Sequence, residues 1–284
     1  MQDGVLGLVK PPGCSSQDAS SLVRRRTGRP AGHLGTLDPL AAGVLVVAFG
    51  RATRLIRYAE GADKEYLAEI WLGCTSASDD FAQPLVRGGD ASRVRLTDVS
   101  AALSPLRGTH PQRPPAYSAR QVAGQRAYRA AREGRPLELP SRMATLRAFT
   151  VERFEGGSTA RLRLHLEVGA GYYVRSLARD LGEALGTGGV LAALVRTRSG
   201  VHGISDCQAL EEPWVPEAPR ALVAHLPAVE LTREEAERIA HGQRLPGAFA
   251  LGPHRAEFSG RLVGVVVGDT EGIWHPQTVL GMED

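Results

Sequence analysis

The sequence predicts an α+β protein with one large domain and a small C-terminal β unit. The length of 284 residues exceeds the usual size of one domain, and with 43% hydrophobic residues the chain can bury a full core. Residues 161–168 alternate apolar and polar side chains as a strand does, whereas residues 174–185 carry an apolar stripe with helical spacing. Prolines between residues 213 and 227 separate this part from a C-terminal part with short apolar runs.

The N-terminal segment is expected to form a strand, a turn and a helix. Residues 4–10 are apolar and predict the strand, and the Pro-Pro-Gly sequence at 11–13 favours the turn. Ser15 or Ser16 should cap the helix, which should end at Gly28.

The next part of the chain alternates predicted strands with loops. After a glycine-rich loop at residues 32–38, residues 41–49 are apolar throughout, and residues 64–72 alternate with the period of a strand. Residues 74–98 are rich in Ser, Asp, Gly and Pro, which predicts a loop-rich excursion that leads to an amphipathic stretch at 99–106.

A basic segment occupies residues 107–147. It has nine arginines against Glu133 and Glu138, a net charge of 9 − 2 = +7, so the other residues together carry 3 − 7 = −4. A helix over residues 122–133 would make this segment an arm over the core. The local charge can neutralise phosphates, which makes nucleic acid the leading partner class, although a solvated helical face explains it equally well.

The C-terminal part should form a second domain that begins near residue 229. The long helix before it should end at Gly186, a position that favours a left-handed residue. Thr232 and Glu235 form a capping-box pattern for a short helix that ends at Gly242. Short strands in a compact β unit are predicted at residues 263–267 and 278–280.

Composition excludes several classes of protein. Cys14, Cys74 and Cys207 lie far apart with no C-x-x-C pair, so neither a disulfide framework nor a zinc site is expected. The longest apolar run, residues 40–49, is about half the length that crosses a bilayer, and the N-terminus lacks a basic segment followed by a hydrophobic one. A soluble, unprocessed cytoplasmic protein with no metal is therefore expected.

Lysine is nearly absent. Of the 34 basic residues, 32 are arginines, and the lysines are Lys10 and Lys64. A compact ammonium retained in such a background indicates positions where a planar guanidinium does not fit.

Asp38 is the candidate for chemistry in the glycine-rich loop. By itself, Asp38-Pro39 is explained most simply as a turn or a helix cap. Two glycines, His33 and Thr36 accompany it within eight residues, in a loop suited to present a side chain to a closely approaching ligand. The loop is not a Walker loop, because Gly-Lys-Ser/Thr is absent.

Several segments of the chain resemble the tRNA pseudouridine synthases of the TruB type. The likeness spans residues 4 to about 205, and the C-terminal unit is similar to a PUA domain. The stretch Gly32-His33-Leu34-Gly35-Thr36-Leu37-Asp38-Pro39 is its most specific part. The other matching segments are Lys10-Pro11-Pro12-Gly13-Cys14-Ser15-Ser16, Lys64-Glu65-Tyr66, Gly171-Tyr172-Tyr173-Val174-Arg175 and Pro114-Pro115-Ala116-Tyr117-Ser118-Ala119 with the residues that follow it.

The resemblance implies a pseudouridine synthase fold with a mixed, largely antiparallel central sheet flanked by helices. It implies a catalytic domain at residues 1–228, with an RNA-binding insertion at about 107–147, and a PUA-like domain at 229–284. The expected activity is isomerisation of the T-loop uridine of tRNA, position 55, to pseudouridine after the base is flipped out. No cofactor is implied, because the reaction needs neither redox chemistry nor energy input. The expected partner is the T-arm of tRNA, with no membrane, no protein partner and a monomeric enzyme.

The resemblance also assigns roles to residues. Asp38 is the attacking carboxylate, Arg175 pairs with it and should lower its pKa, and Tyr66 stacks on the uracil and helps remove the C5 proton. Core packing is the alternative for Tyr66, and a surface position is the alternative for Arg175. Whether Asp38 attacks the sugar or the base, or abstracts a sugar proton to give a glycal, is left open.

Further residues are assigned to RNA binding. His33 would occupy the stack that the uridine leaves, although a lone histidine is more often structural. The other expected RNA contacts are Lys10, Lys64, Tyr173, Arg120, Arg126, Arg129 and Arg132.

Three departures from the family pattern stand out. Position 120 is arginine where the family commonly has lysine. Thr75-Ser76-Ala77-Ser78-Asp79 lacks the first aspartate of the usual Thr-Asp-Thr-x-Asp pattern. Residues 229–284 have five arginines and nine acidic residues, a net charge of 5 − 9 = −4, which gives little support to strong RNA binding there.

Two other functions fit part of the sequence. A non-catalytic module could grip tRNA with the arginine arm and would not need Asp38. An aspartate-nucleophile phosphotransferase would need magnesium, so activity in a chelator separates it from the isomerase.

Overall fold

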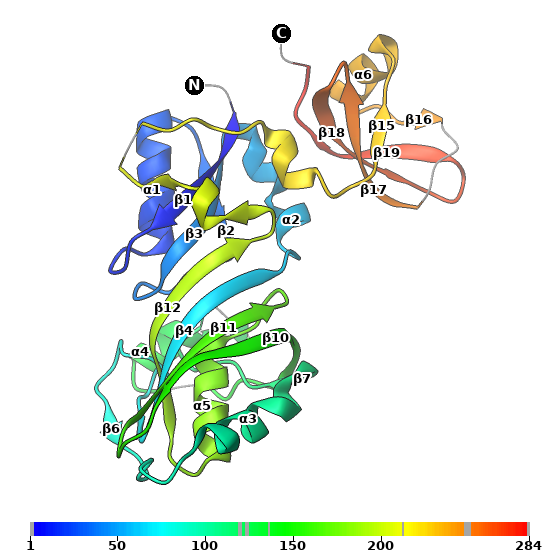
Figure 1. The fold of residues 1–284 in the computed structure, drawn as a ribbon. Helices are drawn as coiled ribbons and strands as arrows, with labels where there is room; N and C mark the ends of the chain where they lie inside the picture. The colour runs from blue at the N-terminus through cyan, green and yellow to red at the C-terminus, as the bar shows by residue number, and fades with distance from the viewer. Residues whose placement is uncertain are drawn as a thin grey trace.

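The computed structural model describes residues 3–118, 121–122, 125–135, 137–211, 213–246 and 251–282. Within them a large mixed sheet forms the body of the molecule, and a smaller sheet lies at its C-terminal end (Figure 1). The large sheet has ten strands in the order β14-β1-β3-β12-β4-β11-β10-β7, with β2 paired to β3 and β13 paired to β12. Only β1–β14 and β3–β12 are parallel pairs among these strands, so the predicted mixed, largely antiparallel sheet is confirmed.

The strands of the large sheet agree with the apolar patterns of the sequence. The predicted strand at residues 64–72 is β4, and its burial alternates along its whole length. The strand predicted at 161–168 is β11, which starts one residue earlier. The strands are β1 (Gly4–Lys10), β2 (Ala31–Leu34), β3 (Ala42–Phe49), β4 (Lys64–Leu72), β7 (Gly108–Gln112), β10 (Arg142–Glu155), β11 (Ala160–Val168), β12 (Gly189–Ser199), β13 (His202–Gly203) and β14 (Gln208–Ala209).

A short parallel contact joins the two halves of this sheet. Val195 and Arg196 of β12 pair with Ala42 and Gly43 of β3. Gly43 has a φ of +103°, and a Cβ atom there would lie 2.2 Å from the carbonyl oxygen of Arg196. Glycine is required at this crossing, which brings Arg196 under the loop between β2 and β3.

Helix α1 (Ser16–Thr27) begins and ends as predicted. Ser15 is its N-cap, in a capping box with Asp18, and Gly28 closes it in the left-handed conformation. The apolar side of α1 packs on β1 and β3 through Ala19 and Val23.

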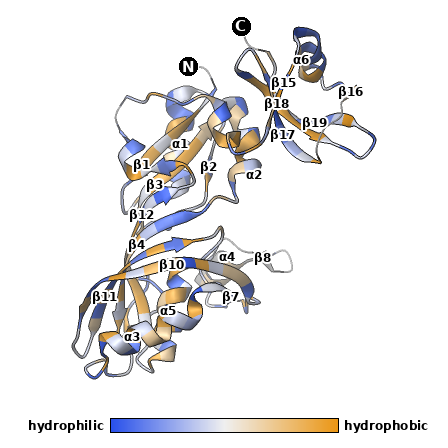
Figure 2. Ribbon diagram, turned by 45° about the vertical axis from the view of Figure 1, so that its right-hand side comes forward, coloured by the Kyte–Doolittle hydropathy of each residue, from blue (hydrophilic) through white to orange (hydrophobic). Residues whose placement is uncertain are grey.

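Helix α5 (Val174–Ala184) also has the predicted apolar stripe. Leu177 and Leu181 pack in the main core with strands β4 and β11 and with α3 (Leu96–Leu103), and hydrophobic residues are visible on these helices in Figure 2. Gly186, just after the helix, has a φ of +69°, as expected for a C-terminal cap. Short elements complete this part: α2 (Ile56–Ala59), β5 (Cys74–Thr75) and β6 (Val86–Arg87).

The arm differs from its prediction. Instead of one helix over residues 122–133, β8 (Gln121–Val122) pairs with β9 (Gln125–Arg126), and the helix α4 spans only Ala127–Arg132. Residues 123 and 124, which join the two strands, lie outside the described residues. Because residues 121–122 and 125–126 pair as strands, the helix begins only at Ala127.

The C-terminal unit is a sheet with one helix. Thr232 caps α6 (Arg233–Ala240) in the predicted capping box with Glu235. Two kinds of contact join this unit to the body. Arg57 and Tyr58 hydrogen-bond to Thr278, and Val265 of the C-terminal sheet shares a core cluster with Val223. The strands are β15 (Ala228–Glu230), β16 (Leu245–Pro246), β17 (Gly252–Phe258), β18 (Arg261–Gly268) and β19 (Ile273–Val279).

Among the helices of the described ranges, none has both the length and the apolar character needed to cross a membrane.

Candidate active site

The loop between β2 and β3 is held through its backbone carbonyls. The carbonyl of Gly35 accepts from Arg196 Nη2 at 2.8 Å. Ser16 Oγ donates to the carbonyl of Leu37 at 2.9 Å and accepts from its N–H at 2.8 Å. The Pro39 carbonyl accepts from the N–H of Gly13 at 2.7 Å. Because residues on both sides of Asp38 are fixed, its side chain is presented from a rigid backbone.

Asp38 also opens a turn, as the simplest interpretation of the sequence has it. The N–H of Ala41 donates to the carbonyl of Asp38 at 3.0 Å, and Pro39 occupies the second position of the turn. The turn uses the backbone of Asp38 and leaves its carboxylate, whose side chain is 36% exposed, available for other contacts.

Arg175 contacts that carboxylate from the first turn of α5. Its Nη2 donates to Asp38 Oδ1 at 3.0 Å, and its Nε lies 2.9 Å from Oδ2. The same guanidinium donates to the carbonyls of Ser78 and Tyr117 at 3.1 and 3.0 Å. Arg175 is 5% exposed, so it is a buried residue and not the surface arginine that the sequence left open.

Asp80 is a second carboxylate at this place, and sequence reasoning missed it. Its Oδ2 lies 3.7 Å from Arg175 Nε, and its Oδ1 accepts from Ser78 Oγ at 2.5 Å and from the N–H of Ala82 at 2.9 Å. Setting the family's Thr-Asp-Thr-x-Asp pattern one residue later, on Ser76, would have placed Asp80 at its last aspartate. The first aspartate of the pattern is then replaced by Ala77.

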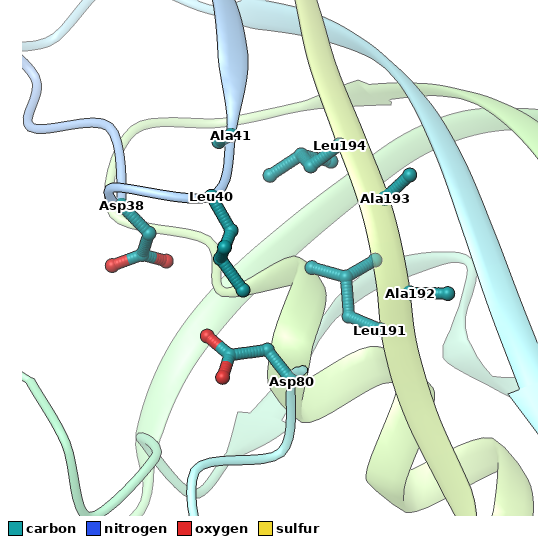
Figure 3. A pocket seen from close by; sticks show the side chains of 8 residues that line it. All are labelled: Asp38, Leu40, Ala41, Asp80, Leu191, Ala192, Ala193 and Leu194. Carbon is teal, nitrogen blue, oxygen red and sulfur yellow. The ribbon is translucent and has the colours of Figure 1, made fainter. Parts of the chain in front are cut away.

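The two carboxylates face the same small space from different segments (Figure 3). They line a cavity of about 10 Å³ together with Leu40, Leu191 and Leu194 and the small residues between them. This volume admits about one water molecule, so a larger ligand would meet Asp38 from the side on which its carboxylate is exposed.

The pKa of Asp38 is raised above its ordinary value of 3.8, although Arg175 by itself lowers it. Burial away from water has the largest effect and raises the pKa. The charge of Arg175 lowers it, as expected, but the nearby carboxylate of Asp80 raises it again. The arginine compensates only part of the cost of placing this charge in the site.

This direction predicts the pH dependence of the reaction. If the ionised Asp38 attacks, activity falls as the pH drops through its raised pKa, so the acidic limb of kcat/KM should lie above the pH of an ordinary aspartate. Asp80→Asn removes the repulsion between the two carboxylates, and the limb should then move to lower pH. The measurement is single-turnover kinetics against pH for both proteins; a limb that stays in place or moves upward contradicts this account.

Tyr66 lies in the core beside the loop. It is 7% exposed and belongs to the main core cluster, which also contains Leu37, the residue before Asp38. Its strand neighbours are Leu166 and Arg196. Tyr66 therefore packs in the core, in the same cluster as the loop that carries Asp38.

Lys10 is not placed for RNA contact, which corrects that expectation. It is 0% exposed, and its ammonium donates to the carbonyls of Pro11, Cys14 and Pro39 at 2.8, 2.6 and 3.4 Å. A buried ammonium with these partners cannot reach a phosphate. It connects the N-terminal motif to the loop of Asp38, a geometry that three donors on one nitrogen allow and a planar guanidinium would not.

Lys64 lies at the edge of a larger cavity. Its ammonium donates to the Ala62 carbonyl at 2.6 Å. The cavity has a volume of about 550 Å³, and Gly35, Arg147 and Arg198 also line it. Arg147 pairs with Asp63 and Arg198 pairs with Glu65, so positive and negative side chains lie together at this cavity.

Tyr173 is fixed at the N-terminus of α5. The side chain of Gln112, from β7, accepts from its N–H at 2.9 Å and donates to its carbonyl at 3.1 Å. Tyr173 is half-buried. No signal in the sequence connected Gln112 with this helix, because the two residues meet only through the pairing of β7 with β10.

His33 lies on β2 with both ring nitrogens engaged. Its Nδ1 is 2.9 Å from Ser20 Oγ, and its Nε2 is 3.2 Å from Thr36 Oγ1. Burial and the nearby charge of Arg196 lower the pKa of the imidazole.

The arginines of the arm are described only in part. Arg129 is exposed and pairs with Glu133 at 2.9 Å, one turn along α4. Arg120 and the side chains of Arg126 and Arg132 lie outside the described residues.

Comparisons with known proteins agree on one family. The model of the N-terminal domain of TruB family pseudouridylate synthases matches residues 24–174. The chain is 41% identical over 263 residues to tRNA pseudouridine synthase B of Thermobifida fusca, covering 89% of this chain and 90% of that protein. Against the tRNA pseudouridine synthase B of Acaryochloris marina it is 38% identical, with 98% of each chain covered.

A solved structure supports the same fold. The structure of an H/ACA RNP bound to a substrate RNA containing 2'-deoxyuridine includes a chain that superposes with a TM-score of 0.73. The two chains are 24% identical, and the superposition covers 99% of this chain and 86% of that one. At this identity the likeness concerns the fold alone.

Proposed function

Because the chain belongs to the TruB family of pseudouridylate synthases, we propose that it converts the T-loop uridine of tRNA, position 55, to pseudouridine by means of Asp38. It is an isomerase, a pseudouridine synthase that acts on tRNA. The observation that carries the role of Asp38 is its pairing with the buried Arg175 at 2.9 and 3.0 Å on a loop fixed at both sides.

The reaction balances without a cofactor. The N1–C1′ bond of the uridine breaks, a C5–C1′ bond forms, the proton on C5 leaves, and N1 gains a proton. Product and substrate are isomers, so neither electrons nor energy must be supplied. A carboxylate that adds to the substrate and later leaves divides the exchange into two easier steps.

Arg175 and Asp80 set the state of Asp38 in this proposal. The guanidinium keeps the carboxylate in place and favours its charge, while burial and Asp80 raise its pKa and so its basicity. A more basic carboxylate is a better nucleophile as long as it stays ionised at the working pH. Tyr66, held by the core next to the loop, is proposed to stack on the uracil and to help remove the C5 proton.

The RNA is proposed to be gripped by the arm and by the body of the enzyme. A folded T-loop stacks its bases, so the target uridine must be extruded, and His33 would take its place in the stack. Lys64 and Tyr173 are proposed as further contacts. The cavity beside Gly35 and Lys64, at about 550 Å³, has room for a nucleotide that flanks the target.

The role of Arg129 can be tested through salt dependence. Each arginine that binds a phosphate releases counterions, so Arg129→Ala should weaken tRNA binding and reduce the slope of log Kd against log salt by about one. Loss of its exposed pair with Glu133 should change stability little. Filter binding over a range of salt concentrations measures both quantities. Arg153→Ala, which removes an exposed arginine on β10 outside the arm, is the control and should leave the slope unchanged.

The function is tested by mapping pseudouridine in tRNA. Transcripts with uridine tritiated at C5 should release tritium on incubation with the enzyme, and carbodiimide mapping should locate the product at the T-loop uridine alone. A chelator should not reduce the activity if the transcript is folded in monovalent salt, whereas a magnesium-dependent phosphotransferase would stop. Tight binding without tritium release would instead identify the non-catalytic tRNA-binding module.

We also propose a cytoplasmic monomer with residues 1–228 as the catalytic domain and 229–284 as a PUA-like domain. Sedimentation of the enzyme with and without tRNA measures its state of association.

A further inference from the structure

Helix α1 supports the loop of His33 and Asp38 with two buried serines one turn apart. Ser16 and Ser20 are each 2% exposed. Ser16 binds the backbone of Leu37, and Ser20 Oγ lies 2.9 Å from Nδ1 of His33. We propose that Ser20 is a positioning residue that fixes the tautomer and the orientation of the His33 ring. The inference rests on the proposed function, because it concerns the ring that would replace the extruded uridine.

The hydrogen bonds have one consistent direction. A serine hydroxyl has a single proton, and that of Ser20 is donated to the carbonyl of Ser16 at 3.0 Å. The oxygen of Ser20 is then the acceptor for Nδ1–H of His33. The remaining ring nitrogen, Nε2, carries a lone pair and accepts from the hydroxyl of Thr36 at 3.2 Å. The chain of donors runs from Thr36 through His33 and Ser20 to the backbone of Ser16.

The surroundings of the ring favour the neutral form that this chain requires. A protonated imidazole has two donors and no acceptor, so it could not accept from Thr36. Burial first, and the charge of Arg196 second, lower the pKa of His33. Arg196 itself is fixed beneath the loop by the carbonyls of Val44 and Gly35 at 2.7 and 2.8 Å.

A ring that is already oriented loses less conformational freedom when it enters the RNA. Ser20 holds the Nδ1 edge of the His33 ring from a rigid helix. The Nε2 edge and the flat faces of the ring therefore keep a fixed orientation relative to Asp38. Without that anchor the ring would sample several rotamers, and a smaller fraction of encounters would be productive. The expected loss is therefore in the rate of base extrusion and not in tRNA affinity, which the arm supplies.

The tautomer can be observed directly by ¹⁵N NMR of the imidazoles of the free protein. His33→Gln identifies the His33 signals among those of the eight histidines. In the wild type, proton attachment is expected at Nδ1. In Ser20→Ala, a mixture with the Nε2–H form is expected, whereas Ser21→Ala, on the same helix and half-buried, should leave the signals unchanged. A wild-type ring protonated at Nε2, or one already averaging between tautomers, would overturn the proposal without any variant.

The consequence for RNA is measured with a fluorescent base next to the target uridine. In the Asp38→Ala background, which binds without reacting, the fluorescence change reports base extrusion alone. Ser20→Ala should slow it roughly fivefold, the effect of one neutral hydrogen bond, with Kd unchanged. In a His33→Gln background Ser20→Ala should have no further effect, because it acts through that ring. Equal slowing in both backgrounds would show a merely structural role and overturn the inference, while the function of Asp38 would be unaffected.

Discussion

Replacement of Asp38 by asparagine is expected to abolish pseudouridine formation while leaving tRNA binding nearly unchanged. The side chain keeps its size but loses the charge and the nucleophilic oxygen, so the covalent route is closed. Removal of an enzyme nucleophile typically lowers the rate by roughly four to six orders of magnitude. Binding should persist because the arm and the loop backbone, held by Ser16 and Gly13, do not depend on this carboxylate.

Two further variants sharpen the test of Asp38. Asp38→Ala excludes regeneration of the carboxylate by slow hydrolysis of the asparagine amide. Asp90→Asn makes the same chemical change at an exposed loop position and should keep full activity. Tritium release from C5-labelled tRNA measures all three proteins, and filter binding measures their affinity. An Asp38→Asn enzyme that turns over at the wild-type rate would end the proposed mechanism.

Replacement of Arg175 by methionine is expected to have the second largest effect. It removes the 2.9 and 3.0 Å contacts that hold the Asp38 carboxylate and leaves that charge beside Asp80 without its paired guanidinium. Misplacement of a reacting group by about 1 Å can cost roughly 10²-fold in rate, so a loss of about that size in kcat/KM is expected when the carboxylate is no longer held. The effect should fall mainly on kcat, because Arg175 is buried and so offers little surface for binding RNA directly.

The pH profile separates this effect from simple misfolding. Because the charge of Arg175 lowers the pKa of Asp38, its removal should move the acidic limb of activity to higher pH, the direction opposite to that of Asp80→Asn. Arg175→Lys keeps the positive charge but not the two-pronged guanidinium. It should therefore restore the pH of the acidic limb more fully than it restores kcat. Arg179→Met is the matched control. Arg179 lies one turn after Arg175 on α5, and it pairs with Asp79 and Asp180 and not with Asp38. Equal losses and an equal shift in both variants would point to damage of the helix.

The site combines a rigid loop backbone with buried charged side chains that are not all paired with an opposite charge. Three buried cations, Lys10, Lys64 and Arg196, surround the loop, and the hydrogen bonds described for their charged groups go to backbone carbonyls. Their charges contribute a positive potential around the loop, because none of these hydrogen bonds neutralises them. The carboxylates Asp38 and Asp80 share Arg175 in the same region.

Local patterns in the sequence predicted most of the regular elements. The capping boxes at Ser15 and Thr232 and the alternation along β4 and β11 are local signals, and the structure confirms each of them. The helix of the arm was predicted too long, because the residues before Ala127 pair as the strands β8 and β9. Asp80 was missed because its motif is degenerate and was aligned one residue too early.

What the sequence determined by itself is the family, the elements and the identity of Asp38 as the candidate nucleophile, because motif residues and strand or helix periods are written in neighbouring positions. What only the tertiary structure decided is how those residues act on one another. It made Lys10 a support of the loop instead of an RNA contact, and it added burial and Asp80, which together outweigh the effect of Arg175 on the pKa of Asp38. The physical reason is that burial and electrostatic effects depend on distances between segments of the chain. Asp38, Asp80 and Arg175 come from three such segments and meet only in the folded protein.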